Sequence, residues 1–337
     1  MDPAAEVRLG RTSLTVTPLG LGTVPLGGLY REVAEADALA VVRHAHELGL
    51  RLFDTAPVYG FGLAERRLGE VLPALPRQEI VVATKVGRLL RADAPPDPAL
   101  QFRGQRMFRG GLDLNPLFDF SYDGAMRSLE ESLTRLRLDR VEIVHIHDPD
   151  DHYEQALAGA YVALHELRAA GTIAAIGAGM TQSVMLARFA READFDCFLL
   201  AGRYSLLDQS ALDNLLPACA ERGIAVIIGG VFNSGILADP DQGATYDYQP
   251  ADRLLIERAH RLRDVCARHG VPLRAAAVQF PSGHPAVTTV LIGVRSVAEL
   301  EDNLRMFRHQ IAPDCWQELK AEGLLRPDAP VPSHVPA

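Results

Sequence analysis

The sequence is short of positive charge and of long apolar runs. It has 34 lysines and arginines against 43 acidic residues, which gives a formal net charge of −9. Nucleic-acid binding needs a basic footprint, so this composition argues against nucleic acid as a partner. No stretch approaches the roughly 18 apolar residues of a membrane-spanning helix. Met1–Arg11 contains no apolar secretory segment. These absences predict a protein without a membrane partner.

Cysteine is also scarce. The four cysteines are Cys197, Cys219, Cys266 and Cys315, and none stands in a C-x-x-C spacing. This spacing disfavours a disulfide framework and a structural zinc site, and it suits a reducing compartment. We therefore predict a cytoplasmic protein with no bound metal.

What is present is a regular alternation of short apolar runs and longer helical patterns. Consecutive apolar residues, as at 225–228, are typical of strands buried on both faces. The predicted strands are Pro18–Thr23, Arg51–Asp54, Ile80–Lys85, Val141–His147, Thr172–Gly177, Asp196–Leu200, Ile224–Ile228 and Thr289–Gly293. The predicted helices are Glu35–Leu48, Asp123–Leu136, Tyr153–Ala169, Ser183–Glu192, Ser210–Glu221, Asp252–His269 and Val297–Phe307.

This alternation predicts an α/β fold with a parallel sheet. No linker divides the chain, so a single-domain (β/α)8 TIM barrel over residues 1–325 is favoured over an open doubly wound sheet. We also expect an N-terminal hairpin, and an extended Pro-rich tail over residues 326–337. The segment Gly87–Phe120, after the third strand, is rich in Pro, Gly and Arg. Its length favours a functional loop, and a solvated excursion is the alternative.

Polar residues follow the second, third and fourth predicted strands. Asp54, Lys85 and His147 end these strands, and Tyr59 comes shortly after Asp54. Active sites of such barrels lie at the carboxyl ends of the strands. We therefore expect these side chains to meet at one mouth.

This set of side chains suits proton transfer at a carbonyl oxygen. A tyrosine, with a pKa of about 10, needs a nearby ammonium to act near neutral pH. Lys85 would supply the ammonium, Asp54 would orient it, and His147 would donate to the substrate oxygen. The chain has no group that carries hydride, so a cofactor must. Singly, each residue has a plainer interpretation, such as a cap for Asp54, a solvated Lys85 or loop packing for Tyr59.

Several motifs together resemble the aldo-keto reductase superfamily along almost the whole chain. They are Leu19–Thr23, Leu52–Gly60, Ala64-Glu65, Leu68-Gly69, Ala83–Lys85 and Ile146–Pro149. The resemblance implies the catalytic tetrad Asp54, Tyr59, Lys85 and His147. It also implies a barrel that binds an extended NADP or NAD cofactor without a Rossmann domain.

Shorter motifs are similar to the aldose 1-dehydrogenase branch, which oxidises a cyclic hemiacetal to a lactone. They are His145–Asp150, Ile176–Met180 and Tyr204–Asp208. That branch includes L-fucose and D-threo-aldose dehydrogenases, and pyridoxal 4-dehydrogenase is a close relative. The branch implies oxidation of an L-fucose-like or D-threo-aldose sugar at C1, with Tyr59 as the general base.

The resemblance also assigns cofactor residues by position. Residues 229–237 match the pyrophosphate loop, whose backbone N–H groups cradle phosphate oxygens. The residues expected to contact cofactor are Gly22, Thr23, Val24, Asp54, Met180, Gly230, Val231, Phe232, Asn233, Ser234, Gly235, Leu237, Gly293, Arg295, Ser296, Glu299 and Asn303.

Some positions depart from the family pattern. Gly179-Met180 replaces a Ser-Asn pair, Ala201 replaces a glutamine and Gly229 replaces an aromatic residue, all of which commonly hold the nicotinamide. Gln182 is an alternative holder of the carboxamide. Glu299 stands where NADP-dependent members often carry an arginine, and its charge would favour NAD. Arg295 could instead bind a 2′-phosphate, which leaves NAD and NADP both open.

The residues that choose the substrate are less defined. Tyr30, Met107 and Arg109 are predicted contacts beside Tyr59 and His147, and Phe108 is another. The expected partner is a small sugar or aldehyde, and the chain is expected to be a monomer or a small homo-oligomer.

Three other functions compete with sugar oxidation. The first is a pyridoxal 4-dehydrogenase or a general aldehyde and ketone reductase on the same tetrad. The second is a non-catalytic regulatory subunit that senses its cofactor. The third is a metal hydrolase, because His145 and His147 point to the same side of one strand. The other strand ends offer no further ligand, and we expect His145 to lie below the mouth, satisfied by hydrogen bonds.

Overall fold

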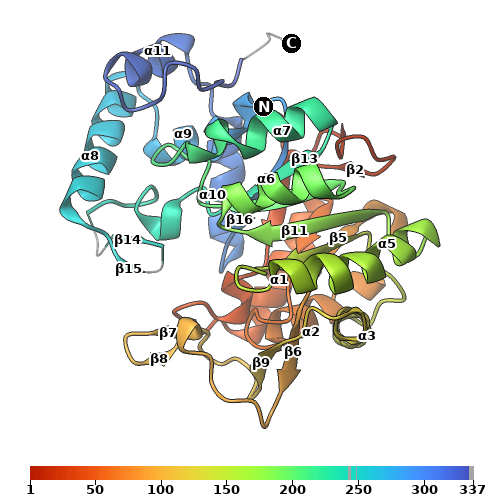
Figure 1. The fold of residues 1–337 in the computed structure, drawn as a ribbon. Coiled ribbons are helices and arrows are strands. Elements are labelled where there is room, and N and C mark those ends of the chain that lie inside the picture. Colours follow the sequence, from red (N-terminus) through yellow and green to blue (C-terminus); the bar gives the residue numbers. More distant parts are fainter. Residues whose placement is uncertain (242–243, 248, 334–337) are drawn as a thin grey trace.

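Parallel strands close into a barrel, in the order β10-β11-β12-β13-β16-β3-β4-β5, and helices surround it as one domain (Figure 1). This computed structural model describes residues 1–241, 244–247 and 249–333. The barrel strands are β3 (Leu19–Gly22), β4 (Leu52–Asp54), β5 (Val81–Val86), β10 (Ile143–His147), β11 (Ala175–Met180), β12 (Cys197–Ala201), β13 (Ala225–Gly229) and β16 (Val287–Gly293). The predicted (β/α)8 barrel is confirmed.

The two faces of each strand have different surroundings, because side chains alternate along a strand. On β10, Val144 and Ile146 pack outward in the large core under the helices. Ile143 instead packs in a smaller core inside the barrel. His145 and His147 share the parity of Ile143 and therefore point into the barrel. The same alternation sends Asp54 and Lys85 inward.

One predicted strand was placed three residues too early. Thr172–Gly177 was expected, whereas β11 runs over Ala175–Met180. Glycine has a low strand propensity, so Gly177 and Gly179 read as an end and not as the body of a strand. The correction places Gly179 and Met180 at the mouth end of β11.

The helices largely follow the predicted segments. They are α1 (Glu35–Glu47), α2 (Leu63–Gly69), α3 (Tyr122–Leu136), α4 (Tyr153–Gln155), α5 (Tyr161–Ala169), α6 (Ser183–Glu192), α7 (Leu215–Arg222), α8 (Arg253–Arg268), α9 (Leu273–Gln279), α10 (Val297–Arg308) and α11 (Pro313–Ala321). A π turn over Ala156–Ala160 interrupts the single helix predicted for Tyr153–Ala169. α9 was missed because all but one of its residues are buried, which removes the amphipathic period.

The N-terminal hairpin joins β1 (Val7–Arg8) to β2 (Thr15–Val16) and closes the amino end of the barrel. Leu9 and Val16 are buried in the inner core. Gly10 has a φ of +52°, and a Cβ atom there would lie 2.6 Å from the carbonyl oxygen of Gly223. Only glycine allows this close approach.

The excursion over residues 87–120 forms two hairpins and is not a loose loop. β6 (Arg88–Arg91) pairs with β9 (Asn115–Phe118), and β7 (Gln101–Phe102) pairs with β8 (Gln105–Arg106). A third hairpin, β14 (Thr245–Tyr246) with β15 (Gln249–Pro250), follows β13. Figure 1 shows these hairpins along the lower and left margins, whereas β2 lies at the upper side.

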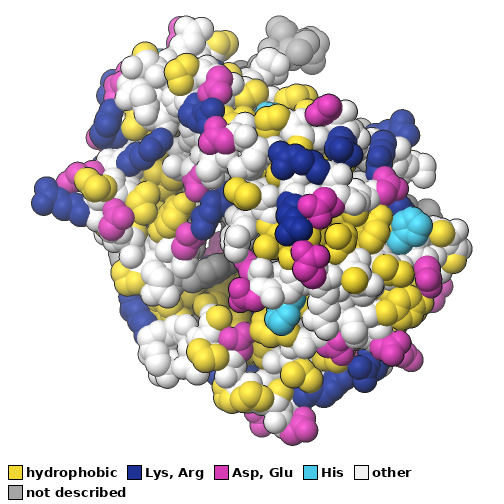
Figure 2. All heavy atoms as spheres, viewed as in Figure 1, with side chains coloured by type: hydrophobic (Ala, Val, Ile, Leu, Met, Phe, Trp, Pro, Cys, Tyr) yellow, Lys and Arg dark blue, Asp and Glu magenta, His cyan; other side chains and the backbone are white. Residues whose placement is uncertain are grey.

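After α11, residues 322–333 carry no helix or strand. Ala329 is fully buried, and Arg326 pairs with Asp213 and Asp328. The end of the predicted tail, residues 334–337, lies outside the described residues. No helix in the described part of the chain has the length and apolar character that crossing a bilayer needs. On the face shown in Figure 2, acidic and basic side chains are interspersed.

Candidate active site

Adjacent barrel strands bring three predicted catalytic side chains together. β4, β5 and β10 are neighbours, and Asp54, Lys85 and His147 lie at or near their carboxyl ends. Tyr59 lies in the loop between β4 and α2, and its ring approaches both Lys85 and His147. The structure thus gathers all four side chains at one mouth.

The Lys85 ammonium has a complete set of acceptors. Its Nζ lies 2.8 Å from Asp54 Oδ1, 2.9 Å from Asp54 Oδ2 and 2.8 Å from the carbonyl oxygen of Thr55. Both charged side chains are almost fully buried. Nζ also lies 4.7 Å from the centre of the Tyr59 ring. A fixed positive charge therefore stands beside the predicted proton-transfer residue.

Burial and pairing act on Asp54 in opposite directions. Burial raises the pKa of the Asp54 carboxyl, and the charge and hydrogen bonds of Lys85 lower it. Removing either partner would leave an uncompensated buried charge, which is costly. The pair is therefore one unit in this site.

His147 lies buried at the edge of the mouth. Burial lowers its pKa well below the ordinary value, and Arg88, Lys85 and His145 lower it further. Its ring meets the ring of Tyr59 edge-on, with the centroids 6.0 Å apart. A neutral imidazole has one N–H to donate, which suits a hydrogen bond to a substrate oxygen.

His145 lies fully buried, one layer below His147. A Cβ atom on Gly177 would lie 2.0 Å from its Nδ1, so the ring occupies the space that this glycine leaves open. Burial, then Lys85, lowers the pKa of His145 to about 3. We expected hydrogen bonds to this ring, and that was wrong: neither ring nitrogen has a partner among the described residues. The same residues contain no group of three or more metal-ligating side chains.

The opposite half of the mouth is lined by the smallest side chains. Gly22, Gly179, Ala201, Gly229 and Gly293 end the other strands with the parity of the inward-facing residues. Added Cβ atoms on Gly22, Gly179 and Gly229 would come no closer than 3.5 Å to any other atom, which is ordinary contact. Packing of the protein itself therefore does not require glycine at these positions. A Cβ atom on Gly179 would lie 3.6 Å from Lys85 Cε, so this strand end borders the Asp54–Lys85 pair.

The predicted pyrophosphate segment follows β13. Gly230, Asn233, Ser234 and Gly235 all have positive φ, which turns the backbone sharply after β13. Asn233 donates to the carbonyl oxygen of Gly202, but its own buried Oδ1 has no partner among the described residues. The side chains of Val231 and Leu237 are buried in the outer core, so these two residues have only backbone atoms to offer a cofactor.

The predicted adenosine segment surrounds the start of α10. The Ser296 hydroxyl accepts from the backbone N–H of Glu299 at 3.2 Å, and the Glu299 carboxylate accepts from that of Arg295 at 2.7 Å. Arg295 Nε and Asn303 Oδ1 are buried without a partner among the described residues. These unpaired atoms, like Asn233 Oδ1, fit polar groups of a bound dinucleotide.

Other predicted cofactor residues contribute less through their side chains. The Thr23 hydroxyl donates to the carbonyl oxygen of Asp54 at 2.9 Å, so it fixes β3 to β4. Val24 is half-buried and precedes a 3-10 turn. The Met180 side chain packs in the outer core, away from the mouth. Phe232 packs partly on the same core. Gln182 is turned toward Asp150, which disfavours it as the holder of a carboxamide.

An aromatic wall stands over the predicted substrate side. Tyr30 binds the excursion through its backbone N–H, which donates to the carbonyl oxygen of Met107 at 2.9 Å. Its ring lies 4.7 Å from that of Phe102. Phe108 and Met107 are both buried, and the Phe108 ring lies 6.3 Å from the Tyr59 ring. Arg109 adds a backbone hydrogen bond to Gly28, at 2.8 Å.

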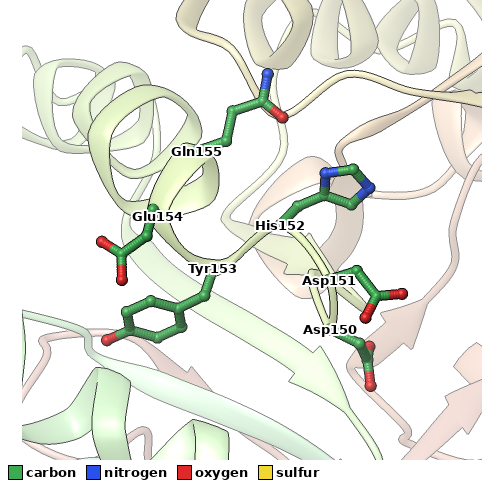
Figure 3. A pocket seen from close by; sticks show the side chains of 6 residues that line it. All are labelled: Asp150, Asp151, His152, Tyr153, Glu154 and Gln155. Atoms are coloured by element: carbon green, nitrogen blue, oxygen red, sulfur yellow. The ribbon is translucent and has the colours of Figure 1, made fainter.

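A pocket of about 300 Å³ lies on the loop after β10. Figure 3 shows the side chains that line it, which are Asp150, Asp151, His152, Tyr153, Glu154 and Gln155. All come from one segment, and none belongs to the predicted tetrad. This acidic pocket lies beside the mouth and is not part of the predicted catalytic set.

Comparison with known proteins agrees with this geometry. Residues 18–322 match the family described as Aldo/keto reductase family. The chain is 44% identical to pyridoxal 4-dehydrogenase of Microbacterium luteolum, over 96% of this chain and 98% of that protein. It is 41% identical to D-threo-aldose 1-dehydrogenase of Pseudomonas sp, over 97% of this chain and 98% of that protein.

The fold has close counterparts among solved structures. The glycerol dehydrogenase AKR11B4 from Gluconobacter oxydans superposes with a TM-score of 0.76 at 20% identity. The match covers 99% of this chain and 98% of the other. At this identity the likeness shows the barrel fold alone and says nothing about the substrate.

Proposed function

Since this chain belongs to the aldo/keto reductase family and is an oxidoreductase acting on CH–OH donors, we propose that it oxidises a cyclic hemiacetal to a lactone. The proposed substrate is an aldose of the L-fucose or D-threo type, oxidised at C1 with a nicotinamide cofactor. The observation that carries this proposal is the position of Lys85, whose ammonium is bound to Asp54 and lies 4.7 Å from the Tyr59 ring centre.

Each side chain of the site has a role in this reaction. Lys85 favours the tyrosinate form of Tyr59, because a nearby positive charge stabilises the anion. Tyr59 takes the hydroxyl proton of the substrate, and neutral His147 donates a hydrogen bond to the same oxygen. A bound nicotinamide supplies the hydride acceptor for C1. The substrate loses one proton and one hydride, which turns its C–OH into the lactone carbonyl.

The residues around the mouth support a nicotinamide ring and a dinucleotide chain. The side of the mouth that Gly179 and Gly229 border would receive the nicotinamide ring. The turn over Asn233 and Ser234 would receive the phosphates. The unpaired Arg295 Nε and Asn303 Oδ1 would bind the adenosine end.

We further propose that the cofactor is NAD. The Glu299 carboxylate lies at the N-terminus of α10, where it accepts the backbone N–H of Arg295. Its charge would repel a 2′-phosphate at this end of the site, whereas a ribose hydroxyl can donate to it. Glu299→Gln keeps the acceptor and removes the charge. We expect the kcat/KM ratio of NADP to NAD to rise about tenfold, or ~1.4 kcal/mol. An unchanged ratio would remove Glu299 as the basis for NAD preference.

A second candidate substrate is pyridoxal, which also forms a cyclic hemiacetal. Phe108 favours it, because this buried ring lies 6.3 Å from that of Tyr59 and places an aromatic side chain next to the proposed reacting group. A flat pyridine ring would stack there, with a gain of about 0.5–1.5 kcal/mol beyond its buried area. The 44% identity to a pyridoxal 4-dehydrogenase supports the same candidate.

The test is the appearance of reduced nicotinamide absorbance, with NAD and NADP supplied separately. The substrates are L-fucose, L-galactose, D-arabinose, pyridoxal and a simple aliphatic alcohol. Oxidation of a sugar supports the first proposal, and oxidation of pyridoxal alone supports the second. Activity only in the reducing direction, on aldehydes, would overturn both and identify a general reductase. Cofactor binding without turnover on any substrate would identify a regulatory subunit.

A further inference from the structure

Arg88 and Asp148 form an ion pair beside Nε2 of His147. Arg88 Nη2 lies 2.6 Å from Asp148 Oδ2, and the same oxygen lies 3.4 Å from His147 Nε2. The two residues come from different parts of the chain, since Arg88 begins β6 and Asp148 follows β10. The pair lies against the predicted hydrogen-bond donor of the mouth.

We propose that Arg88 and Asp148 are positioning residues that hold His147 in its neutral, Nε2-protonated form. This inference rests on the proposed function, in which His147 donates a hydrogen bond to the substrate oxygen. Asp148 provides the acceptor that selects the proton position, and Arg88 balances the charge that Asp148 brings.

The choice of tautomer follows from the surroundings of the two ring nitrogens. His147 Nδ1 is buried with no partner among the described residues. A proton on Nδ1 would be an unsatisfied buried donor, which costs about 1–3 kcal/mol. A proton on Nε2 instead faces the Asp148 carboxylate. The carboxylate is a third exposed, so it can rotate away and leave Nε2–H to an arriving substrate oxygen.

Without Arg88, the carboxylate of Asp148 would draw a second proton onto the imidazole. The guanidinium opposes this by neutralising Asp148 and by its own repulsion of a protonated His147. The charged and titratable groups that face His147 from the neighbouring elements are Lys85 of β5, Arg88 of β6, His145 of β10, Asp148 after β10 and Tyr59 after β4. Asp150 acts on Asp148 from the same loop.

The excursion holds Arg88 in place. The guanidinium carbon of Arg88 lies 5.0 Å from the centre of the Phe118 ring. Phe118 in turn stacks on His152, with the two ring centres 5.6 Å apart. Gly87 precedes Arg88 with a φ of +104°, and a Cβ atom there would lie 2.1 Å from the Phe120 ring. This turn directs β6 back over the mouth, so one role of the excursion is to deliver Arg88 to Asp148.

The test measures His147 directly, by NMR of protein labelled in its histidine rings, with His147→Gln used for assignment. In the unaltered protein we expect the nitrogen shifts to show a proton on Nε2 only, and no protonation between about pH 5 and 8. Arg88→Met should make His147 protonate within that range, by an upward shift of about one unit or more. The double variant Arg88→Met/Asp148→Asn should abolish this protonation, because the attracting carboxylate is gone.

Two further variants complete the design. Arg88→Lys keeps the charge and should leave His147 neutral, and Asp150→Asn, a matched loss of one nearby carboxylate, should have no effect. A proton on Nδ1 in the unaltered protein, an unchanged His147 in Arg88→Met, or persistent protonation in the double variant would overturn the proposal. The tautomer measurement does not use Arg88→Met, so misfolding of that variant leaves the proposal testable. These signals do not depend on turnover, so they separate this inference from the choice of substrate.

Discussion

Asp54 binds Lys85 through both of its carboxylate oxygens, at 2.8 and 2.9 Å, inside a barrel where neither side chain reaches solvent to any extent. The third acceptor of the ammonium is the carbonyl oxygen of Thr55, at 2.8 Å. The position of the Lys85 ammonium is therefore fixed before any substrate binds. Tyr59 stands next to a preset electrostatic environment.

Replacement of Tyr59 by phenylalanine tests the proton path. Tyr59→Phe keeps the ring beside Phe108 and removes only the oxygen that exchanges the proton. We expect kcat to fall by at least about 100-fold, in line with the loss of a general base. Cofactor affinity, measured by fluorescence titration, should stay within about twofold because no proposed phosphate contact changes. Turnover within tenfold of the unaltered enzyme would contradict this role.

The Asp54–Lys85 pair predicts a non-additive effect on stability. Asp54→Leu leaves an unpaired buried ammonium and should lower the free energy of unfolding by about 3–5 kcal/mol. The double variant Asp54→Leu/Lys85→Met removes both charges and should recover most of that loss. Urea denaturation of both variants provides the measurement. Equal losses in the single and double variants would show that pairing of the two charges does not determine the stability of this site.

Two glycines on β11 provide a matched pair of variants that test the proposed position of the nicotinamide ring. A Cβ atom on Gly179 makes only ordinary contacts, the closest at 3.5 Å, whereas one on Gly177 would lie 2.0 Å from His145 Nδ1. Gly179→Ala should leave the unfolding free energy within about 1 kcal/mol and weaken nicotinamide binding about tenfold or more, or ~1.4 kcal/mol. Gly177→Ala should instead lower stability. Unchanged cofactor affinity in Gly179→Ala would place the ring elsewhere.

His145 predicts that stability declines in mild acid. Its folded-state pKa is about 3, below the unfolded value of about 6.5. The unfolded chain therefore binds more protons between these values, so the contribution is complete above about pH 6.5 and is lost as pH falls toward the folded value. The slope from this residue is about 1.4 kcal/mol per pH unit. Urea denaturation of His145→Gln at ~pH 5 and ~pH 6 should show a flatter dependence of the unfolding free energy on pH than the unaltered protein shows. An equal slope would contradict the assignment.

Much of the barrel was accessible from sequence because buried parallel strands carry continuous apolar runs, as at residues 225–228. The meeting of three residues of the predicted tetrad was accessible for a related reason: Asp54, Lys85 and His147 each interrupt such a run at its end. The order of strands around the barrel then places them side by side. α9 was missed, since a helix buried on nearly all sides has no polar face to mark its period.

The Arg88–Asp148 pair shows what the sequence could not supply. Both residues stand next to predicted strand ends, but their contact depends on the register of β6 with β9 and on the turn at Gly87. Neither feature leaves a periodic signal. The hydrogen-bond environment of His145 was predicted wrongly for a similar reason, because it depends on the space that Gly177 leaves on the neighbouring strand β11.

The hairpin of β1 and β2 has a consequence for traffic through the molecule. Leu9 and Val16 stop the barrel at its amino end, so the mouth is the route by which His145 and Lys85 communicate with water. Substrate, product, water and the proton released in the proposed oxidation would then all pass through the mouth. If Tyr59 takes the substrate proton as proposed, an occupant of the mouth would separate that proton from bulk water until the occupant leaves.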